Sequence, residues 1–187
     1  MPMPLQLTTP PSTEPVTLAE AKAHLKVDTT DDDTLISSLI AAARARAEWH
    51  THRAFIAQGW TLWRDAWPAN GIFEIPLSPL QSVTAVTSYA LDDAATIFDT
   101  STYLVDTASE PARIAFDCDT APSNLRRINA IAIAFTAGYG AATTDVPEPI
   151  RRAILAIVAD LYIHRGDDTP TPDTALALLA PYRVLNL

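Results

Sequence analysis

Cysteine and glycine are both scarce in this chain. The one cysteine among 187 residues, Cys118, excludes a disulfide framework within the chain and a zinc or iron–sulfur site built from several thiolates. Only five glycines are present, and no G-x-S-x-G, P-loop or G-x-G-x-x-G pattern occurs. Because the sequence lacks the loops that cradle phosphates or present a nucleophilic serine, we expect no enzyme and no cofactor.

Positive charge is also in short supply. Lysine and arginine total 13 against 22 aspartates and glutamates, which gives a formal net charge of −9. A protein that grips DNA ordinarily carries a basic excess, since neutralising phosphates supplies much of the affinity. The charge balance therefore argues against tight nucleic-acid binding, although an acidic surface can face DNA without holding it.

Long apolar runs are missing as well. The longest apolar stretch without charge, from residue 128 to about 142, is shorter than the about 20 residues that a membrane helix needs. Its alternation, followed by Gly138-Tyr139-Gly140, predicts a strand and a turn. Residues 1–4 contain neither a basic residue nor an apolar run, so they do not indicate a secretory signal. We expect a soluble, intracellular protein.

The rest of the composition is that of a globular domain, with 48% hydrophobic and 19% charged residues. The order of patterns along the chain is helices, then strands, then helices. We expect a mainly α fold of the α+β class, in which the N- and C-terminal helices form a helical bundle with an inserted antiparallel β lobe. The expected divisions are a flexible arm 1–15, N-terminal helices 16–57, the β lobe 58–146, and C-terminal helices with a docking tail 147–187, with 16–187 a single domain.

Local signals place the helices. Thr17-Leu18-Ala19-Glu20 is a capping-box sequence, in which the hydroxyl and the carboxylate satisfy backbone N–H groups at a helix start. Further on, apolar residues recur at helical rather than alternating spacing, and both Leu155 and Ile157 are expected in the core. The predicted helices cover residues 17–26, 31–53, 148–165 and 173–179.

Between these helices the pattern is that of an antiparallel meander or small sandwich. Short β-prone segments recur every 8–15 residues or so and are separated by Pro, Gly, Asp or Asn. No helix-length apolar pattern interrupts them, which argues against a parallel βαβ sheet. The predicted strands are 60–63, 72–75, 83–89, 103–105, 113–116 and 128–135.

Candidate metal ligands are few. His50 and His52 are the only close histidine pair, but at i and i+2 on a helix their rings point about 200° apart and cannot share a metal. The Asp31-Asp32-Asp33 run lacks the alternation, glycine and distant glutamate of a calcium loop, so helix capping and the helix dipole explain it. A metal hydrolase that uses these histidines is therefore disfavoured.

Two other features have structural explanations. Cys118 lies between Asp117 and Asp119, whose charges would raise the pKa of a thiol, the opposite of what a nucleophile needs. Trp60, Trp63 and Trp67 could stack bases, but they lack the interleaved basic residues of a single-strand binder. We interpret these tryptophans as core or protein-contact residues.

An ordered set of segments gives the chain a resemblance to a known family. These segments are 15–22 (Pro-Val-Thr-Leu-Ala-Glu-Ala-Lys), 24–28, 32–36 with the helix up to Arg53, 58–62, 79–83, 135–140 (Phe-Thr-Ala-Gly-Tyr-Gly), Val146-Pro147 and the helix 150–165. Together they resemble the head–tail connector, or adaptor, proteins of long-tailed phages and phage-derived gene transfer agents. The resemblance extends over residues 15–185.

The resemblance implies a structural role. Copies of the chain would form a ring, expected to be twelve-fold, beneath the portal protein at the capsid vertex. The ring would extend the DNA channel and dock a neck stopper or tail proteins, in a virion or phage-like particle assembled in the bacterial cytoplasm. Double-stranded DNA would pass through the lumen without specific binding, because an acidic lining repels phosphates.

A second function remains open, that of a DNA-packaging module such as a small terminase-like subunit. It would need a basic recognition helix, whereas residues 41–53 hold only three arginines beside Glu48. The structural connector is therefore the favoured hypothesis.

The C-terminal segment is the candidate docking element. Chain ends are usually polar, but this one is mostly apolar with one arginine, and the prolines at 170 and 172 would let it reach away from the core. We expect it to insert against the portal or a neighbouring subunit. The alternative is that it folds back onto its own helices. The candidate docking residues are Tyr182, Arg183, Val184, Leu185 and Leu187.

Overall fold

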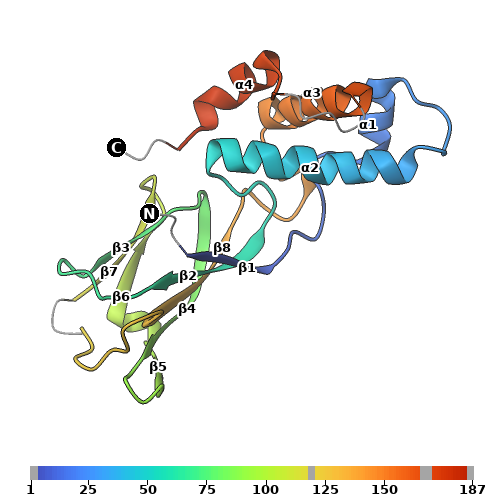
Figure 1. Cartoon of the computed structure of the whole chain (residues 1–187). Coiled ribbons are helices and arrows are strands. Elements are labelled where there is room, and N and C mark those ends of the chain that lie inside the picture. Colours follow the sequence, from blue (N-terminus) through green and yellow to red (C-terminus); the bar gives the residue numbers. More distant parts are fainter. Residues whose placement is uncertain (1–3, 118–120, 165–169, 185–187) are drawn as a thin grey trace. The chain divides into compact units, whose positions relative to one another are not determined.

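The chain folds as two compact units (Figure 1). A computed structural model describes residues 4–117, 121–164 and 170–184. Of these, residues 4–11 and 57–138 form the β unit, and residues 12–56 and 139–184 form the helical unit. Two segments far apart in the sequence therefore build the helical unit, and most of the β unit is inserted between them. No helix among the described residues is long and apolar enough to cross a membrane.

Helix accounts for 35% and strand for 29% of the structure, so the α+β class is confirmed, with the two contents nearly balanced rather than helix dominating. The helices are α1 (Leu18–Leu25), α2 (Asp33–Thr51), α3 (Glu148–His164) and α4 (Asp173–Leu179), with short 3-10 turns η1 (Thr100–Thr102), η3 (Thr143–Asp145) and η4 (Ala180–Tyr182). The strands are β1 (Leu5–Thr9), β2 (Gln58–Arg64), β3 (Ile72–Ile75), β4 (Leu80–Tyr89), β5 (Ala95–Ile97), β6 (Tyr103–Asp106), β7 (Ala112–Phe116) and β8 (Ile131–Ala137).

Local chemistry sets the ends of the first two helices. Thr17 caps α1: its hydroxyl accepts from the backbone N–H of Glu20, whose carboxylate accepts from the backbone N–H of Thr17. The predicted capping box is thus confirmed. Helix α2 ends where His52 adopts a left-handed conformation with φ of 55°. That residue lies one position before the predicted end of the helix.

The core of the helical unit lies between the apolar faces of its helices. Helix α2 buries Ile36, Ile40 and Ala43, and α3 buries residues with the same helical spacing. The loop after α2 adds two fully buried side chains, Phe55 and Ile56. The buried members from α3 and α4 are Ile150, Ala153, Ile154, Ile157, Val158, Ala175 and Leu179.

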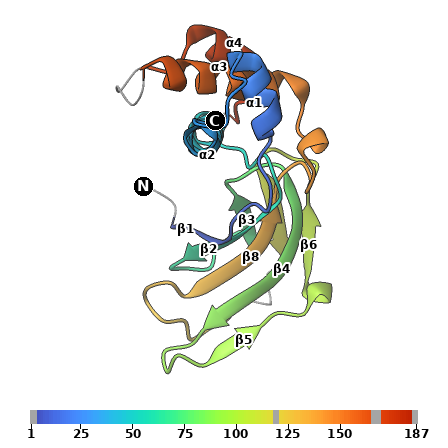
Figure 2. The ribbon, with the colours of Figure 1, turned by 90° about the vertical axis from the view of Figure 1, so that its right-hand side faces the viewer.

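The β unit contains two antiparallel sheets. The larger has the strand order β1-β2-β8-β4-β5, and the smaller has the order β3-β7-β6. Strand β8 lies between β2 and β4, as Figure 2 shows, and five of its seven residues are buried. In the smaller sheet region, Trp67 packs edge-on against Phe73 and Phe116, with ring centroids 5.1 and 4.8 Å away. Trp67 is half-buried and packs with these rings, in line with one of the two roles, core or protein contact, that the sequence predicted.

Two strands were not predicted. Residues 1–15 were expected to be a flexible arm, but residues 5–9 form β1, which pairs antiparallel with β2. A side chain at Gly59 would bring its Cβ to 3.0 Å from Oγ1 of Thr9, so glycine there gives β1 the room to pair. Strand β5 is three residues long and exposed, so it leaves no apolar alternation to detect.

The core position of Ile157 yields a stability prediction. Its side chain is fully buried, whereas that of Leu155 is only partly buried against the same core. We expect Ile157→Ala to lower the free energy of unfolding by about 2–5 kcal/mol, the range for deleting buried aliphatic groups. Leu155→Ala, the control on the same helix, should cost clearly less. Equal losses in thermal or urea unfolding would contradict this packing.

Candidate assembly surfaces

The C-terminal segment is fastened to the end of α2. The backbone N–H of Val184 donates to the carbonyl of Thr51 at 3.0 Å, and Nε of Arg53 donates to the carbonyl of Tyr182. Thr51 and Arg53 are themselves buried. The last described turn therefore belongs to the helical unit and is held mainly through its backbone.

These contacts bear on the predicted docking residues. Val184 is 6% exposed and Tyr182 packs partly buried against the helical core, as the back-folding alternative describes. Arg183 is exposed, and no ion pair to a described residue engages it. Leu185 and Leu187 lie outside the described residues. Docking by this segment stays a prediction, and Arg183 is its exposed described member.

The segment before α1 is fastened by a partly buried cation. Arg44 of α2 donates to Glu14 and to Glu48, each at 2.7 Å, and Glu48 also accepts from the backbone N–H of Phe55 at 2.8 Å. Burial acts to lower the pKa of Arg44, but the bond to Glu14 and the charge of Glu48 outweigh it and raise the pKa. The guanidinium thus ties three parts of the helical unit together.

A second cation joins α1 to α3. Arg151 pairs with Glu20 and Glu148 and donates to the carbonyl of Pro15 at 3.1 Å. The pKa of Glu20 is lowered, first by the bond from the backbone N–H of Thr17. Burial opposes this, and the Thr17 hydroxyl and the charge of Arg151 reinforce it. The capping box and the ion pair therefore share one carboxylate.

The acidic run at the start of α2 is engaged within the helical unit. Asp33 pairs with Lys22 of α1 at 2.5 Å, and Asp32 accepts from the hydroxyl of Tyr162 on α3 at 2.5 Å. The expected side-chain cap is wrong for Asp32, which lies at the N-cap position but forms no capping bond. A tyrosine 130 residues away in the sequence competes for this carboxylate.

The two candidate metal ligands, His50 and His52, lie in different surroundings at the end of α2. His50 is half-buried within the helix, while His52 is exposed at its left-handed C-cap. Among the residues that the structure describes, no three His, Cys, Asp or Glu side chains gather closely enough to hold a metal ion. Cys118 lies outside the described residues.

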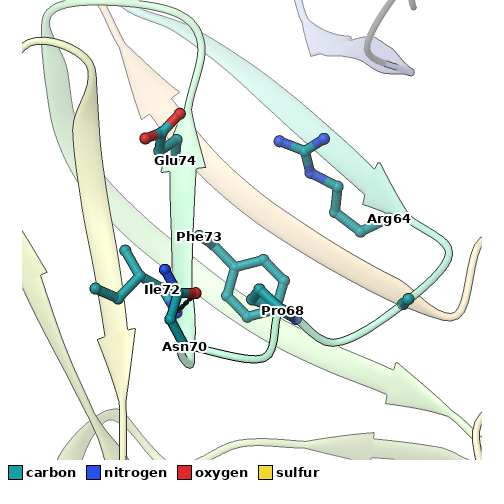
Figure 3. Close-up of a pocket in the computed structure, with 7 residues that line it drawn as sticks. Arg64, Pro68, Asn70, Ile72, Phe73 and Glu74 are labelled. Carbon is teal, nitrogen blue, oxygen red and sulfur yellow. Dashed lines mark hydrogen bonds between the residues drawn. The ribbon is translucent and has the colours of Figure 1, made fainter.

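The β unit carries a shallow hollow of about 260 Å³ beside the loop that joins β2 to β3 (Figure 3). Arg64 of β2 and Glu74 of β3 flank it, and the carboxamide oxygen of Asn70 accepts from the backbone N–H of Ile72 at 3.1 Å. This bond shapes the turn, in which Gly71 has φ of 66°. The geometry is that of a loop braced by its own polar groups. The lining residues are Arg64, Ala66, Pro68, Asn70, Ile72, Phe73 and Glu74.

Exposed apolar side chains are the features that sequence reasoning missed. Trp49 on α2 is 81% exposed, and its nearest ring contact is His52, with centroids 6.4 Å apart. Its position opposite the apolar face of the helix is a signal that the sequence already contained. In the β unit the most exposed of the large apolar side chains, each at least 63% exposed, are Leu91, Ile97, Leu104 and Ile128.

Comparison with known proteins decides the family. The sequence pattern of the family described as phage gp6-like head-tail connector protein matches residues 15–112, more than half of the chain. The chain belongs to this family. The resemblance expected from the sequence is thereby confirmed, and the connector has a structural head–tail role. A comparison with curated proteins gives no significant match.

Solved structures show the fold in full. The connector matches a chain in the neck of an empty gene transfer agent (GTA) particle computed with C6 symmetry, with a TM-score of 0.86 and 24% identity. It matches a chain in the neck of a native GTA particle computed with C12 symmetry, with a TM-score of 0.83 and 25% identity. Each match covers 99% of this connector and 97% of the other chain.

The geometry around Arg44 predicts a large effect of its removal. The arginine is 14% exposed and pairs with two carboxylates. Arg44→Met should therefore lower the free energy of unfolding by about 3 kcal/mol, because it leaves partly buried carboxylates without their cation. Arg152 also pairs with a glutamate but is 66% exposed, and Arg152→Met should cost less than about 1 kcal/mol. Chemical unfolding of both variants measures the contrast, and equal losses would exclude the fastening role.

The lowered pKa of Glu20 predicts a pH dependence. Above its ordinary pKa of 4.5 the carboxylate is charged in both states, and its contribution to stability is fully present. This contribution is lost as the pH falls through the lower pKa of the folded state. We expect Glu20→Gln to melt below the wild type at pH 7, with the difference shrinking toward zero at acidic pH. Glu74→Gln, an exposed control in the β unit, should show no such convergence, and a constant difference for Glu20→Gln would contradict the assignment.

Proposed function

We propose that copies of this chain form a ring beneath the portal of a tailed phage or a gene transfer agent. The ring extends the DNA channel and offers a docking surface to neck and tail proteins. Its role is structural and non-catalytic, and the N- and C-terminal helices form the body that carries its contacts. The observation that carries the proposal is the connector family match over residues 15–112.

The likeness to neck structures supports the ring. The two neck particles were computed with C6 and C12 symmetry, and their matching chains share the fold over 97% of their length. Cyclic symmetry of this kind requires each subunit to present two different, complementary surfaces to its neighbours. Twelve copies are the number we propose, in the neck of the particle, after assembly in the bacterial cytoplasm.

The charge of the chain supports passage of DNA rather than binding. With a net charge of −9, each subunit repels phosphates, and twelve subunits multiply that repulsion around a lumen. Double-stranded DNA then slides through the ring without a specific contact. A small terminase-like packaging role gains no comparable support, because it needs a basic surface that recognises DNA.

The C-terminal segment is proposed to dock on the portal or on a neighbouring subunit. Arg183 is exposed and follows the anchored Tyr182, so its guanidinium is available to an acidic partner surface. Leu185 and Leu187 complete the proposed docking residues by their sequence alone.

Particles produced with and without the chain test the proposed function. We expect a ring of density at the head–tail junction in wild-type particles, and heads that contain portal but no tail when the chain is deleted. The isolated protein should sediment mainly as a monomer, since the ring forms on the portal. Complementation with wild-type chain is the control and should restore tails. Tailed particles that form after the chain is deleted would exclude the proposal. Wild-type particles in which the chain is absent would exclude it as well.

A further inference from the structure

The face of α2 opposite the core is apolar and exposed. We call Leu35, Ser38, Ala42, Ala45 and Trp49 the α2 outer face. They recur at spacings of three and four, on the side opposite Ile36, Ile40 and Ala43, and all are exposed. A surface helix ordinarily carries its charges on the side away from the core. Here the one charged residue near that side is Arg46, which lies at its edge and is half-buried, and the face ends in a tryptophan that is 81% exposed.

The ion pairs of α2 lie on the flanks of the helix instead. Arg44 is held by Glu14 and Glu48 within the unit. The outer face itself therefore offers no ionic contact, and small side chains at positions 38, 42 and 45 leave space for another helix between Leu35 and Trp49. An exposed apolar face of this kind marks a surface that another element covers.

Helix α4 presents a matching face. Ala175 and Leu179 are buried, whereas Thr174, Ala177 and Leu178 are exposed on the opposite side of the helix, at i, i+3 and i+4. Pro181, in the η4 turn that follows, is exposed as well. We call these four residues the α4 outer face. It carries no charge either, and the exposed Arg183 follows it directly.

We propose that the α4 outer face of one copy covers the α2 outer face of the next copy in the ring. Arg183 of the first copy then lies against the indole of Trp49 in the next copy. This inference rests on the proposed ring. It supplies the two different surfaces that a head-to-tail contact needs. Subunits that each carry a charge of −9 repel one another, so two uncharged faces are where they meet at least cost. The arginine and the exposed indole are complementary as a cation–π pair.

Single-cysteine variants test the pairing directly. In a Cys118→Ser background, Ala45→Cys and Ala177→Cys chains are mixed in equal amounts, assembled into particles and oxidised. We expect a disulfide-linked dimer in the mixture and none with either variant alone. A dimer from Ala45→Cys alone would mean that α2 pairs with its own copy, and wild-type-like rings without any cross-link would mean that another element covers the face. Either result overturns the inference.

Charged substitutions give a second, independent test. Ala45→Glu should melt like the wild type, because the residue is exposed, yet its incorporation into neck rings should fall about tenfold or more, as for interface hot spots. Ala23→Glu is the matched control, an exposed alanine on α1, and should incorporate normally. Trp49→Ala and Arg183→Ala should each weaken incorporation, and the double variant should do no worse than the stronger single one. Normal incorporation of Ala45→Glu overturns the assignment of the face, whereas absence of wild-type chain from neck rings refutes the proposed function itself.

Discussion

The structure of the helical unit depends on the contact between α2 and α3, two helices from opposite ends of the sequence. Ile36 and Ile40 of α2 and Ile154 and Ile157 of α3 are all buried in one core. Each such side chain contributes about 1.5–3 kcal/mol when removed from water. That gain offsets the entropy of closing a long insertion, which grows only slowly with loop length.

Backbone bonds at the base of the insertion complete the closure. The N–H of Tyr139 donates to the carbonyl of Phe55 at 3.0 Å, and Ile56 forms an isolated parallel bridge with Gly140. Here the chain leaves the first helical segment and enters the second. These contacts within the helical unit therefore close the base of the insertion.

Much of this fold could be predicted because its signals are local. The capping box at Thr17 and the apolar spacing of α2 and α3 need only neighbouring residues. The partners of Asp32 and Val184 could not be predicted, because Tyr162 and Thr51 reach them from distant parts of the chain. Strand β1 was not predicted because an edge strand pairs with only one neighbour and needs little alternation of apolar and polar residues. Trp49 was overlooked although its place on the helix marks it.

These long-range backbone bonds explain how the proposed assembly surfaces can be ordered before any partner binds. The C-terminal segment is held by the backbone of Val184 and by the carbonyl of Tyr182. These bonds use no part of the α4 outer face or of the Arg183 side chain. Since the core of one subunit already fixes the backbone that carries these groups, a neighbour has less conformational entropy to remove on docking. A contact of modest area can then be specific, while the acidic charge of the subunits opposes other arrangements.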